Sequence, residues 1–290
     1  MTGSRADSKL VFIDKSRFFA PSLNRSRPEG QLANPREFMA DLARSIGFLS
    51  RLPVPDRFFR GYDGSVSRAV RAFPLAGLVV AALPALLLFL ALQSGNSFLA
   101  AFLALALQAL LTGALHEDGL ADTADGLGGG RDKEHALLIM KDSRVGTYGV
   151  IALILSFGLR ASALSALSFA GSDVAALAML ATAAFSRAAM VLHWKNLPSA
   201  RDGGVAANAG APEQDATTIA LGIGLVVGLA LLLPVLPVPP VVFAIIAGGL
   251  AAYAFTRFTE KKLGGHTGDT IGAAQQLTEI AMLAALALAV

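Results

Sequence analysis

The chain alternates long apolar runs with polar segments, and this pattern predicts membrane-spanning helices. A run of about 18 or more apolar residues is long enough to cross the ~30 Å hydrocarbon core of a bilayer as a helix. The predicted spans cover about residues 72–92, 98–116, 148–170, 174–193, 217–236 and 241–255. The last apolar run, residues 280–290, is too short to cross alone at about 1.5 Å per residue. We expect it to form a half-span or to be extended by residues 275–279.

The part of the chain before the first span predicts an extension and an amphipathic helix. Residues 35–52 carry apolar side chains at helical spacing, with charged residues between them. Such a helix lies in the membrane interface, packs against the bundle, or is an ordinary soluble helix, and the pattern leaves these open. The preceding residues lack the apolar stretch of a secretory signal. We therefore expect residues 1–35 to be a flexible polar extension and residues 36–290 to form an integral-membrane domain.

Composition supports a membrane protein. Charged residues make up 16% of the chain and the mean hydropathy is +0.59, whereas soluble domains carry about 25% charged residues. The chain has no cysteine, which excludes a disulfide framework and a thiolate metal site or nucleophile. The predicted fold is all-α: a polytopic membrane helix bundle of about six to seven transmembrane helices with an N-terminal amphipathic helix.

The basic residues predict the orientation of the bundle. The net charge is +3 and the pI is about 9.4, values that would also suit a nucleic-acid-binding protein. Lys and Arg, however, occur before the first span and in the three long polar segments, and are absent from the three short connectors. The positive-inside rule then places the N-terminus and all three polar segments in the cytosol. We expect a multi-pass protein of the cytoplasmic (inner) membrane, with the lipid bilayer and not nucleic acid as its partner.

Three aspartates predict a metal site at the end of the second span. At about 100° per residue, Asp122 lies about 40° from Asp118, and Asp125 lies about 20° away on the other side. Like charges on one stripe repel, and no Lys or Arg occurs between Arg71 and Arg131 to offset them. Hard oxygen ligands suit Mg²⁺, Mn²⁺ or Ca²⁺. The alternative is a solvated acidic loop, but small residues separate the acids and leave the stripe open.

Two neighbouring residues do not fit this stripe. Glu117 lies about 100° off it, which makes it a weaker ligand candidate. His116 is either a group that supports the ligands or an interfacial histidine.

Arg160 falls in the middle of the third predicted span, where an arginine normally faces a polar partner. No acid occurs at a comparable depth of the predicted spans, so the sequence names no partner for it.

Further polar groups fall on the same predicted side. Lys141, Asp142, Ser143 and Arg144 directly precede the third span, where cations and hydroxyls suit phosphate binding. A basic anchor with a helix cap explains this segment equally well. The glycine-rich run at residues 264–270 includes Gly268, Asp269 and Thr270, and suits either phosphate binding or an ordinary turn. Lys195, Arg201 and Asp202 fall on the same predicted side of the membrane, the cytosolic side.

Together these features predict an enzyme that transfers a phosphate-linked group. Catalysis of that kind depends mostly on positioning and charge neutralisation. The spaced aspartates resemble the signature of the CDP-alcohol phosphotransferases, although the form D-x-x-D-G-x-x-A-R is absent. A third possibility is a carboxylate-lined divalent-cation transporter. Such a protein requires acids in the middle of the membrane, whereas the acids of this chain fall at one end of a predicted span.

A closer resemblance covers the chain from about residue 36 to its end. The runs LHEDGLADTADGL at 115–127, GGRD at 129–132 and IMKDSRVGT at 139–147 resemble the cobalamin synthase family, the adenosylcobinamide-GDP ribazoletransferases. FLSRLPVP at 48–55, FPLAG at 73–77 and GDTIGA at 268–273 extend the similarity. The aspartate-rich run is highly specific. Glu117, where we expect an apolar residue, and the basic N-terminal extension depart from the family pattern.

The resemblance implies an activity and a set of roles. α-Ribazole, or its 5′-phosphate, would attack the phosphorus attached to cobinamide in adenosylcobinamide-GDP, and GMP would leave. Mg²⁺ would be the cofactor, held by Asp118, Asp122 and Asp125. Lys141 and Arg144 would steady phosphate oxygens, and Asp142 and Asp269 would be further ligand or base candidates. The expected catalytic set is Asp122, Lys141, Asp142 and Arg144, and the expected substrate-binding set is Lys141, Ser143, Arg144, Gly268, Asp269 and Thr270. Whether the protein forms homo-oligomers is open.

Overall fold

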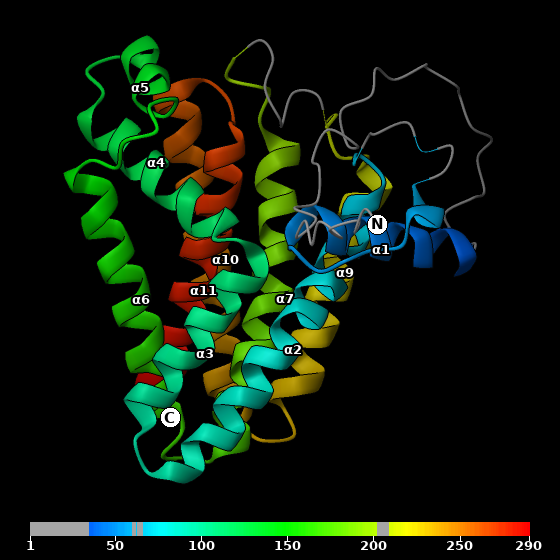
Figure 1. Cartoon of the computed structure of the whole chain (residues 1–290), viewed down its shortest axis with the longest axis vertical. Helices are drawn as coiled ribbons and strands as arrows, with labels where there is room; N and C mark the ends of the chain where they lie inside the picture. Colours follow the sequence, from blue (N-terminus) through cyan, green and yellow to red (C-terminus); the bar gives the residue numbers. More distant parts are fainter. Residues whose placement is uncertain (1–34, 60–61, 63–65, 202–208) are drawn as a thin grey trace, which may run out of the picture.

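The computed structural model describes residues 35–59, 62, 66–201 and 209–290. Within these residues the fold is all-helical, and the only β-type pairing is an isolated bridge between Ser199 and His266. The helices, drawn in Figure 1, are α1 Pro35–Leu49, η3 Asp56–Phe58, η4 Ala69–Ala72, α2 Phe73–Ala91, η5 Leu92–Ser94, α3 Ser97–Thr112, α4 Leu115–Gly129, α5 Lys133–Ile139, α6 Thr147–Leu167, α7 Ser172–Asn196, α9 Gln214–Leu232, α10 Val238–Leu263 and α11 Gly268–Ala289. The expected flexible extension falls almost wholly on residues 1–34, outside the described part.

Six helical stretches in the described residues are long and apolar enough to cross a membrane. They are the stretch Ala69–Ser94, which contains α2, and helices α6, α7, α9, α10 and α11. The predicted polytopic helical bundle is confirmed. Of the two expectations for residues 280–290, the half-span is wrong and the extension holds. Helix α11 includes residues 275–279, begins still earlier at Gly268 and runs for 22 residues. At about 1.5 Å per residue this helix reaches across the hydrocarbon core.

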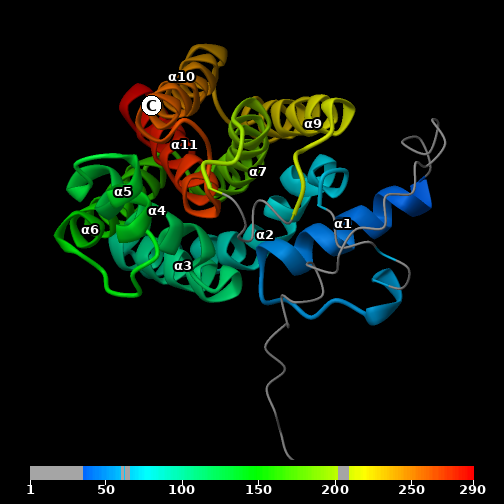
Figure 2. The same cartoon turned by 90° about the horizontal axis from the view of Figure 1, so that it is seen from above.

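Helix α7 lies at the centre of the bundle. It packs against α2, α9 and α11, and Figure 2 shows it between these three helices. Its buried face is rich in alanine, and small residues let helices approach closely in a membrane, where apolar area alone does not drive association. Gly77 of α2 illustrates this, because a Cβ built there would lie 2.7 Å from the carbonyl oxygen of Ala183.

Helices α3 and α4 form a bent pair that carries the aspartate stripe. Their axes differ by 91°, and the bend falls at Gly113 and Ala114, which both have positive φ angles (65° and 55°). Glycine adopts this left-handed conformation without strain, whereas a non-glycine residue does so rarely. The predicted second span therefore ends at Thr112 rather than at residue 116. The following polar segment is not a loop but begins with helix α4, which packs against α11 and α6.

The predicted amphipathic helix is present as α1, and it packs on the bundle. Figure 1 shows α1 running across the N-terminal end of α2. Its buried Asp41, 2% exposed, accepts hydrogen bonds from Arg71 at 2.8 Å and from Arg44 at 3.1 Å. This ion pairing fixes α1 to the start of the first span, at the end of the molecule where α4, α5 and the start of α11 also lie.

Candidate active site

The aspartate stripe lies on a helix, as predicted, and its charges are incompletely neutralised. Asp118 is exposed and Asp122 is half-buried on α4. Burial, and then the nearby carboxylates of Asp118, Asp269 and Asp125, raise the pKa of Asp122 from 3.8 to about 7, while Arg201 offsets this in part. Burial makes the largest contribution to this shift, and the neighbouring carboxylates add negative charge that a cation would offset. The site is therefore suited to a bound cation.

Asp125 has a different environment from the other two aspartates. It is 7% exposed, and its two carboxylate oxygens accept hydrogen bonds from the backbone N–H groups of Gly146 at 2.6 Å and Gly149 at 2.8 Å. These glycines lie at the start of α6, where the helix dipole favours a negative charge. Any Cβ at either position would collide with the Asp125 carboxylate. Asp125 therefore joins α4 to α6, and its role as a metal ligand stays a prediction.

The start of α11 brings a further carboxylate to the stripe. Asp269 accepts hydrogen bonds from Arg201 and Thr267, each at 3.2 Å. Helices α4 and α11 approach closely here, because a Cβ on Gly119 would lie 2.7 Å from the carbonyl oxygen of Asp269. Gly119 is thus required for packing, and not only to leave the stripe open. The carboxylates of Asp118, Asp122 and Asp269, together with Arg201, define what we call the carboxylate site.

Of the neighbouring substrate-binding candidates, Gly268 is exposed and Thr270 is buried. Thr270 is 0% exposed and its hydroxyl hydrogen-bonds Thr267 and His193. The Thr270 hydroxyl closes the capping box of α11 together with Thr267. Its observed role is to hold the helix start that presents Asp269.

The basic residue at the carboxylate site is Arg201, which the sequence pattern did not distinguish from its neighbours. One of its guanidinium nitrogens, Nη2, binds Asp269. The other, Nη1, is buried and has no hydrogen-bond partner within the described part of the chain. A guanidinium with a free donor is suited to a phosphate oxygen. Asp202, beside it, lies outside the described residues.

The loop before α6 is arranged differently from the expected phosphate site. Arg144 and Asp142 pair with each other at 2.6 Å, and this pairing lowers the pKa of Asp142 to about 2. Lys141, Ser143 and Arg144 are exposed. No hydrogen bond or ion pair between described residues joins them to Asp118 or Asp122, so their contact with substrate stays a prediction. A carboxylate with so low a pKa is a weak general base at neutral pH.

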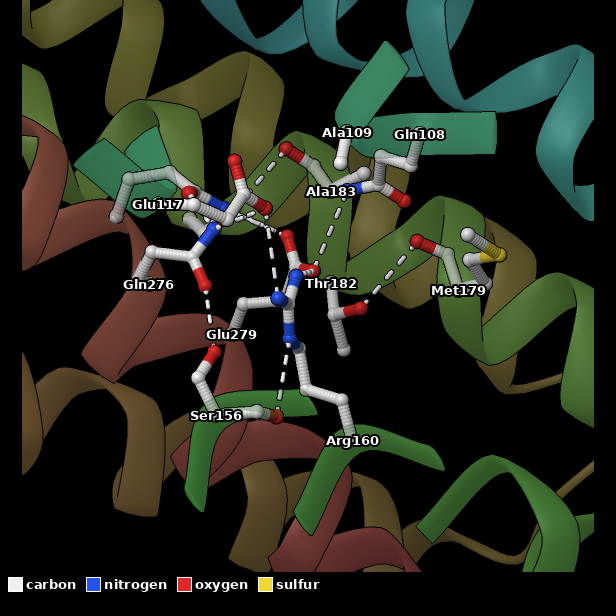
Figure 3. Close-up of polar contacts among 12 residues, drawn as sticks. Gln108, Ala109, Glu117, Ser156, Arg160, Met179, Thr182, Ala183, Gln276 and Glu279 are labelled. Atoms are coloured by element: carbon white, nitrogen blue, oxygen red, sulfur yellow. Dashed lines mark hydrogen bonds and ion pairs between the residues drawn. The ribbon is translucent and has the colours of Figure 1, made fainter. Parts of the chain in front are cut away.

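A buried charge network explains Glu117 and Arg160. Arg160 donates to Glu117 at 3.4 Å and to Glu279 of α11 at 3.1 Å, and Arg187 of α7 donates to Glu279 at 2.9 Å. All four side chains are at most 6% exposed. Figure 3 shows Glu117, Arg160 and Glu279 converging from three different helices. The sequence pattern did not reveal this partner, because Glu279 lies at the edge of a short apolar run.

The charge network is electrically balanced, and two glutamines add hydrogen bonds to its carboxylates. Two guanidinium groups face two carboxylates, and Gln275 donates to Glu279 at 2.6 Å while Gln276 donates to Glu117 at 3.1 Å. Balanced pairing of this kind is what makes buried ions tolerable inside a membrane protein. The network connects α4 to α6, α7 and α11, and therefore fixes the helix that carries Asp118 and Asp122.

The carboxylate site has the donor chemistry for a hard divalent cation but not a complete set of ligands. No group of three or more His, Cys, Asp or Glu side chains in the described residues is already arranged to hold a metal ion. Mg²⁺ is usually held by one or two carboxylates plus substrate phosphates, and not by an all-protein cage. The site therefore fits a cation that binds together with a phosphorylated substrate.

Comparison with known proteins identifies close relatives over nearly the whole chain. The family model described as cobalamin-5-phosphate synthase matches residues 41–287. Proteins named adenosylcobinamide-GDP ribazoletransferase are 59% identical in Rhizobium meliloti (strain 1021), covering 89% of this chain and 100% of the relative, and 61% identical in Sinorhizobium medicae (strain WSM419), covering 88% and 98%. The Brucella anthropi protein of that name is 44% identical, over 87% of this chain and 97% of its own. No solved structure matches the chain.

The charge network predicts a large stability difference between two glutamates. Glu279→Ala leaves Arg187 without its carboxylate partner and should destabilise the protein by about 3–5 kcal/mol. Glu260→Ala removes a carboxylate that pairs with Arg257 at 2.6 Å on the exposed end of α10, and should cost no more than about 1 kcal/mol. Unfolding in detergent, followed by circular dichroism, measures both. Equal losses in the two variants would contradict the account of the network.

Proposed function

The chain belongs to the cobalamin-5-phosphate synthase family, and we propose that its carboxylate site catalyses the transfer of the cobinamide-bound phosphate from GMP to ribazole. The protein is a transferase of cobalamin biosynthesis that joins adenosylcobinamide-GDP to α-ribazole, or to its 5′-phosphate, with release of GMP. The observation that carries this conclusion is the match over residues 41–287, which includes both α4 and the start of α11. The match supports neither a CDP-alcohol phosphotransferase nor a cation transporter.

The reaction defines what the site must do. A ribose hydroxyl oxygen of the acceptor forms a bond to the phosphorus attached to cobinamide. The bond between this phosphorus and the bridging oxygen of GMP breaks, GMP keeps the electron pair, and the hydroxyl proton is released. Negative charge on the diphosphate hinders the approach of the nucleophile, so neutralising and orienting that diphosphate is the main task of the protein.

The residues of the carboxylate site suit this task when Mg²⁺ is present. Asp118, Asp122 and Asp269 would hold the cation, and the cation would supply charge neutralisation for the diphosphate. The raised pKa of Asp122 supports this assignment, because neighbouring carboxylates add to the effect of burial and a cation would offset their charge. Asp125 would position α4 against α6 and lie behind the ligands. This differs from the expected set of Asp118, Asp122 and Asp125 in giving Asp269 the ligand role.

The phosphate contacts would come from two places. Arg201 has a buried donor, Nη1, without a hydrogen-bond partner among the described residues, and this donor would bind a phosphate oxygen. Lys141, Ser143 and Arg144 lie on the loop that follows α5, at the same end of the molecule as the start of α11 (Figure 1). We assign them to the rim of the site, where they would contact a substrate that the structure does not hold. Gly268, exposed at the first turn of α11, leaves room for substrate beside Asp269.

Substitution of Asp122 tests the metal assignment. Asp122→Asn should lower the rate of GMP release by more than about 100-fold, which exceeds the ~10–100-fold loss typical of residues that only support metal ligands. Asp173→Asn, at the start of α7 on the opposite connector, is the matched control and should leave the rate unchanged. Both variants should unfold near the wild-type temperature in detergent. Full activity of folded Asp122→Asn, or of the wild type after chelation of divalent cations, would refute the assignment.

We also infer that the carboxylate site faces the cytosol from the cytoplasmic membrane. The support is the location of the basic residues, which flank the site end of the bundle, whereas the connector between α2 and α3 at the other end has none. A cytosolic site also has direct access to nucleotide-bearing substrates.

Single-cysteine labelling measures this orientation, because the chain has no cysteine of its own. Ser94 lies in the exposed connector after α2, and Lys261 is exposed near the end of α10. In intact spheroplasts, a membrane-impermeant maleimide should label Ser94→Cys, and should label Lys261→Cys only after the membrane is opened. The reverse pattern would overturn the orientation.

A further inference from the structure

A cavity of about 240 Å³ lies directly beside the carboxylate site. Its walls come from the end of α1, the start of α4, the end of α7 and the start of α11. The apolar and aromatic wall residues used below are Phe48, Met190, Trp194 and Ile271, and the polar side chains of His116, Asp118 and Asp269 also line the cavity. A ligand in this cavity would therefore touch the two carboxylates that we assign to the cation.

The cavity walls are mainly apolar, and the polar rings in them are the indole of Trp194 and the imidazole of His116. Trp194 is 2% exposed, and its indole N–H has no hydrogen-bond acceptor within the described part of the protein. A buried donor without a partner is unfavourable, and a ligand that brings one acceptor removes this penalty. The expected ligand group is thus flat or aliphatic and carries very few hydrogen-bonding atoms.

The aromatic walls are held in place before any ligand binds. Phe48 stacks on Phe73 of α2, with ring centroids 5.9 Å apart. Trp194 packs edge-on against His266, with centroids 6.3 Å apart. A slot whose wall rings are already packed against their neighbours favours an aromatic ring, because little side-chain order has to be created on binding.

Size and polarity distinguish between the groups that take part in the reaction. Whole drug-sized ligands occupy pockets of about 300–1,000 Å³, so this cavity suits one bicyclic ring and is too small for a corrin macrocycle. Guanine carries several donors and acceptors on its edges, and apolar walls would leave them unpaired. The dimethylbenzimidazole of ribazole has two methyl groups and a single free ring nitrogen, which is an acceptor.

We propose that this cavity, walled by Phe48, Met190, Trp194 and Ile271, binds the dimethylbenzimidazole ring of the ribazole acceptor. A small shift of the buried Trp194 side chain brings its indole N–H to the free ring nitrogen, to which it donates. The ribose then extends toward Asp118 and Asp269, which brings its hydroxyl to the carboxylate site. This assignment rests on the proposed function and adds the acceptor subsite to it. It makes Trp194 and Met190 specificity residues and not catalytic ones.

The protein has a single tryptophan, Trp194, and it lies in the cavity wall, so its fluorescence measures binding directly. Titration of the purified full-length protein in detergent with α-ribazole should give a saturable change in Trp194 emission, without any turnover. GMP at the same concentrations should not produce it. A response to GMP and none to α-ribazole would overturn the proposal.

Two variants test the specificity that the cavity walls imply. Met190→Phe narrows the slot, and should raise the KM for α-ribazole at least about 10-fold while changing the KM for the unmethylated benzimidazole riboside much less. Trp194→Phe keeps a ring but removes the donor, and should raise the KM for both ribosides by a similar factor of about 10. Neither change should alter the KM for adenosylcobinamide-GDP. The control Tyr253→Phe, on the exposed face of α10, should change nothing.

The outcomes separate the subsite from the activity. If both variants release GMP with wild-type KM values for the ribosides, the subsite is wrong and the transferase activity stands. If the wild-type protein binds α-ribazole but releases no GMP, the proposed function fails instead. If Met190→Phe fails to fold, the kinetics of Trp194→Phe and the titration of the wild-type protein test whether the cavity binds the acceptor ring.

Discussion

The buried ionic contact among Glu117, Arg160, Glu279 and Arg187 is the interaction on which the site depends. Four charges inside a membrane bundle are tolerable only when each faces a partner of opposite sign. Here carboxylates and guanidinium groups alternate along the series of contacts, with N···O distances of 2.9–3.4 Å. The four residues come from α4, α6, α7 and α11, so the network holds these helices in one arrangement. Apolar packing alone, between alanine-rich surfaces, specifies that arrangement much less strictly.

The same two helices that supply proposed ligands also enter the network. On α4, Glu117 faces inward and the adjacent Asp118 faces the site, and on α11, Asp269 begins the helix that carries Glu279 near its middle. Rotation of either helix would break an internal ion pair as well as move a ligand. Close contact at Gly119 adds a steric limit to this electrostatic one. The network thereby gives the carboxylate site and the neighbouring cavity a fixed geometry.

Sequence patterns predicted most of the fold and part of the site, and the failures have physical causes. Apolar runs identified the spans, and helical spacing placed Asp118, Asp122 and Asp125 on one helix. The full length of α11 was missed because Gln275, Gln276 and Glu279, which serve the network, interrupt its apolar pattern. The 91° bend was missed because both arms are helical and only Gly113 marks it. Arg201 was not singled out because its contact with Asp269 joins residues far apart in sequence.

The central claim is that carboxylates from α4 and α11 together hold a divalent cation against the substrate diphosphate. Electron paramagnetic resonance of Mn²⁺ bound to the purified protein, with adenosylcobinamide-GDP present, measures this directly. The account predicts a saturable Mn²⁺ site whose affinity falls at least about 10-fold in Asp118→Asn and also in Asp269→Asn. Wild-type Mn²⁺ affinity in both folded variants would contradict it.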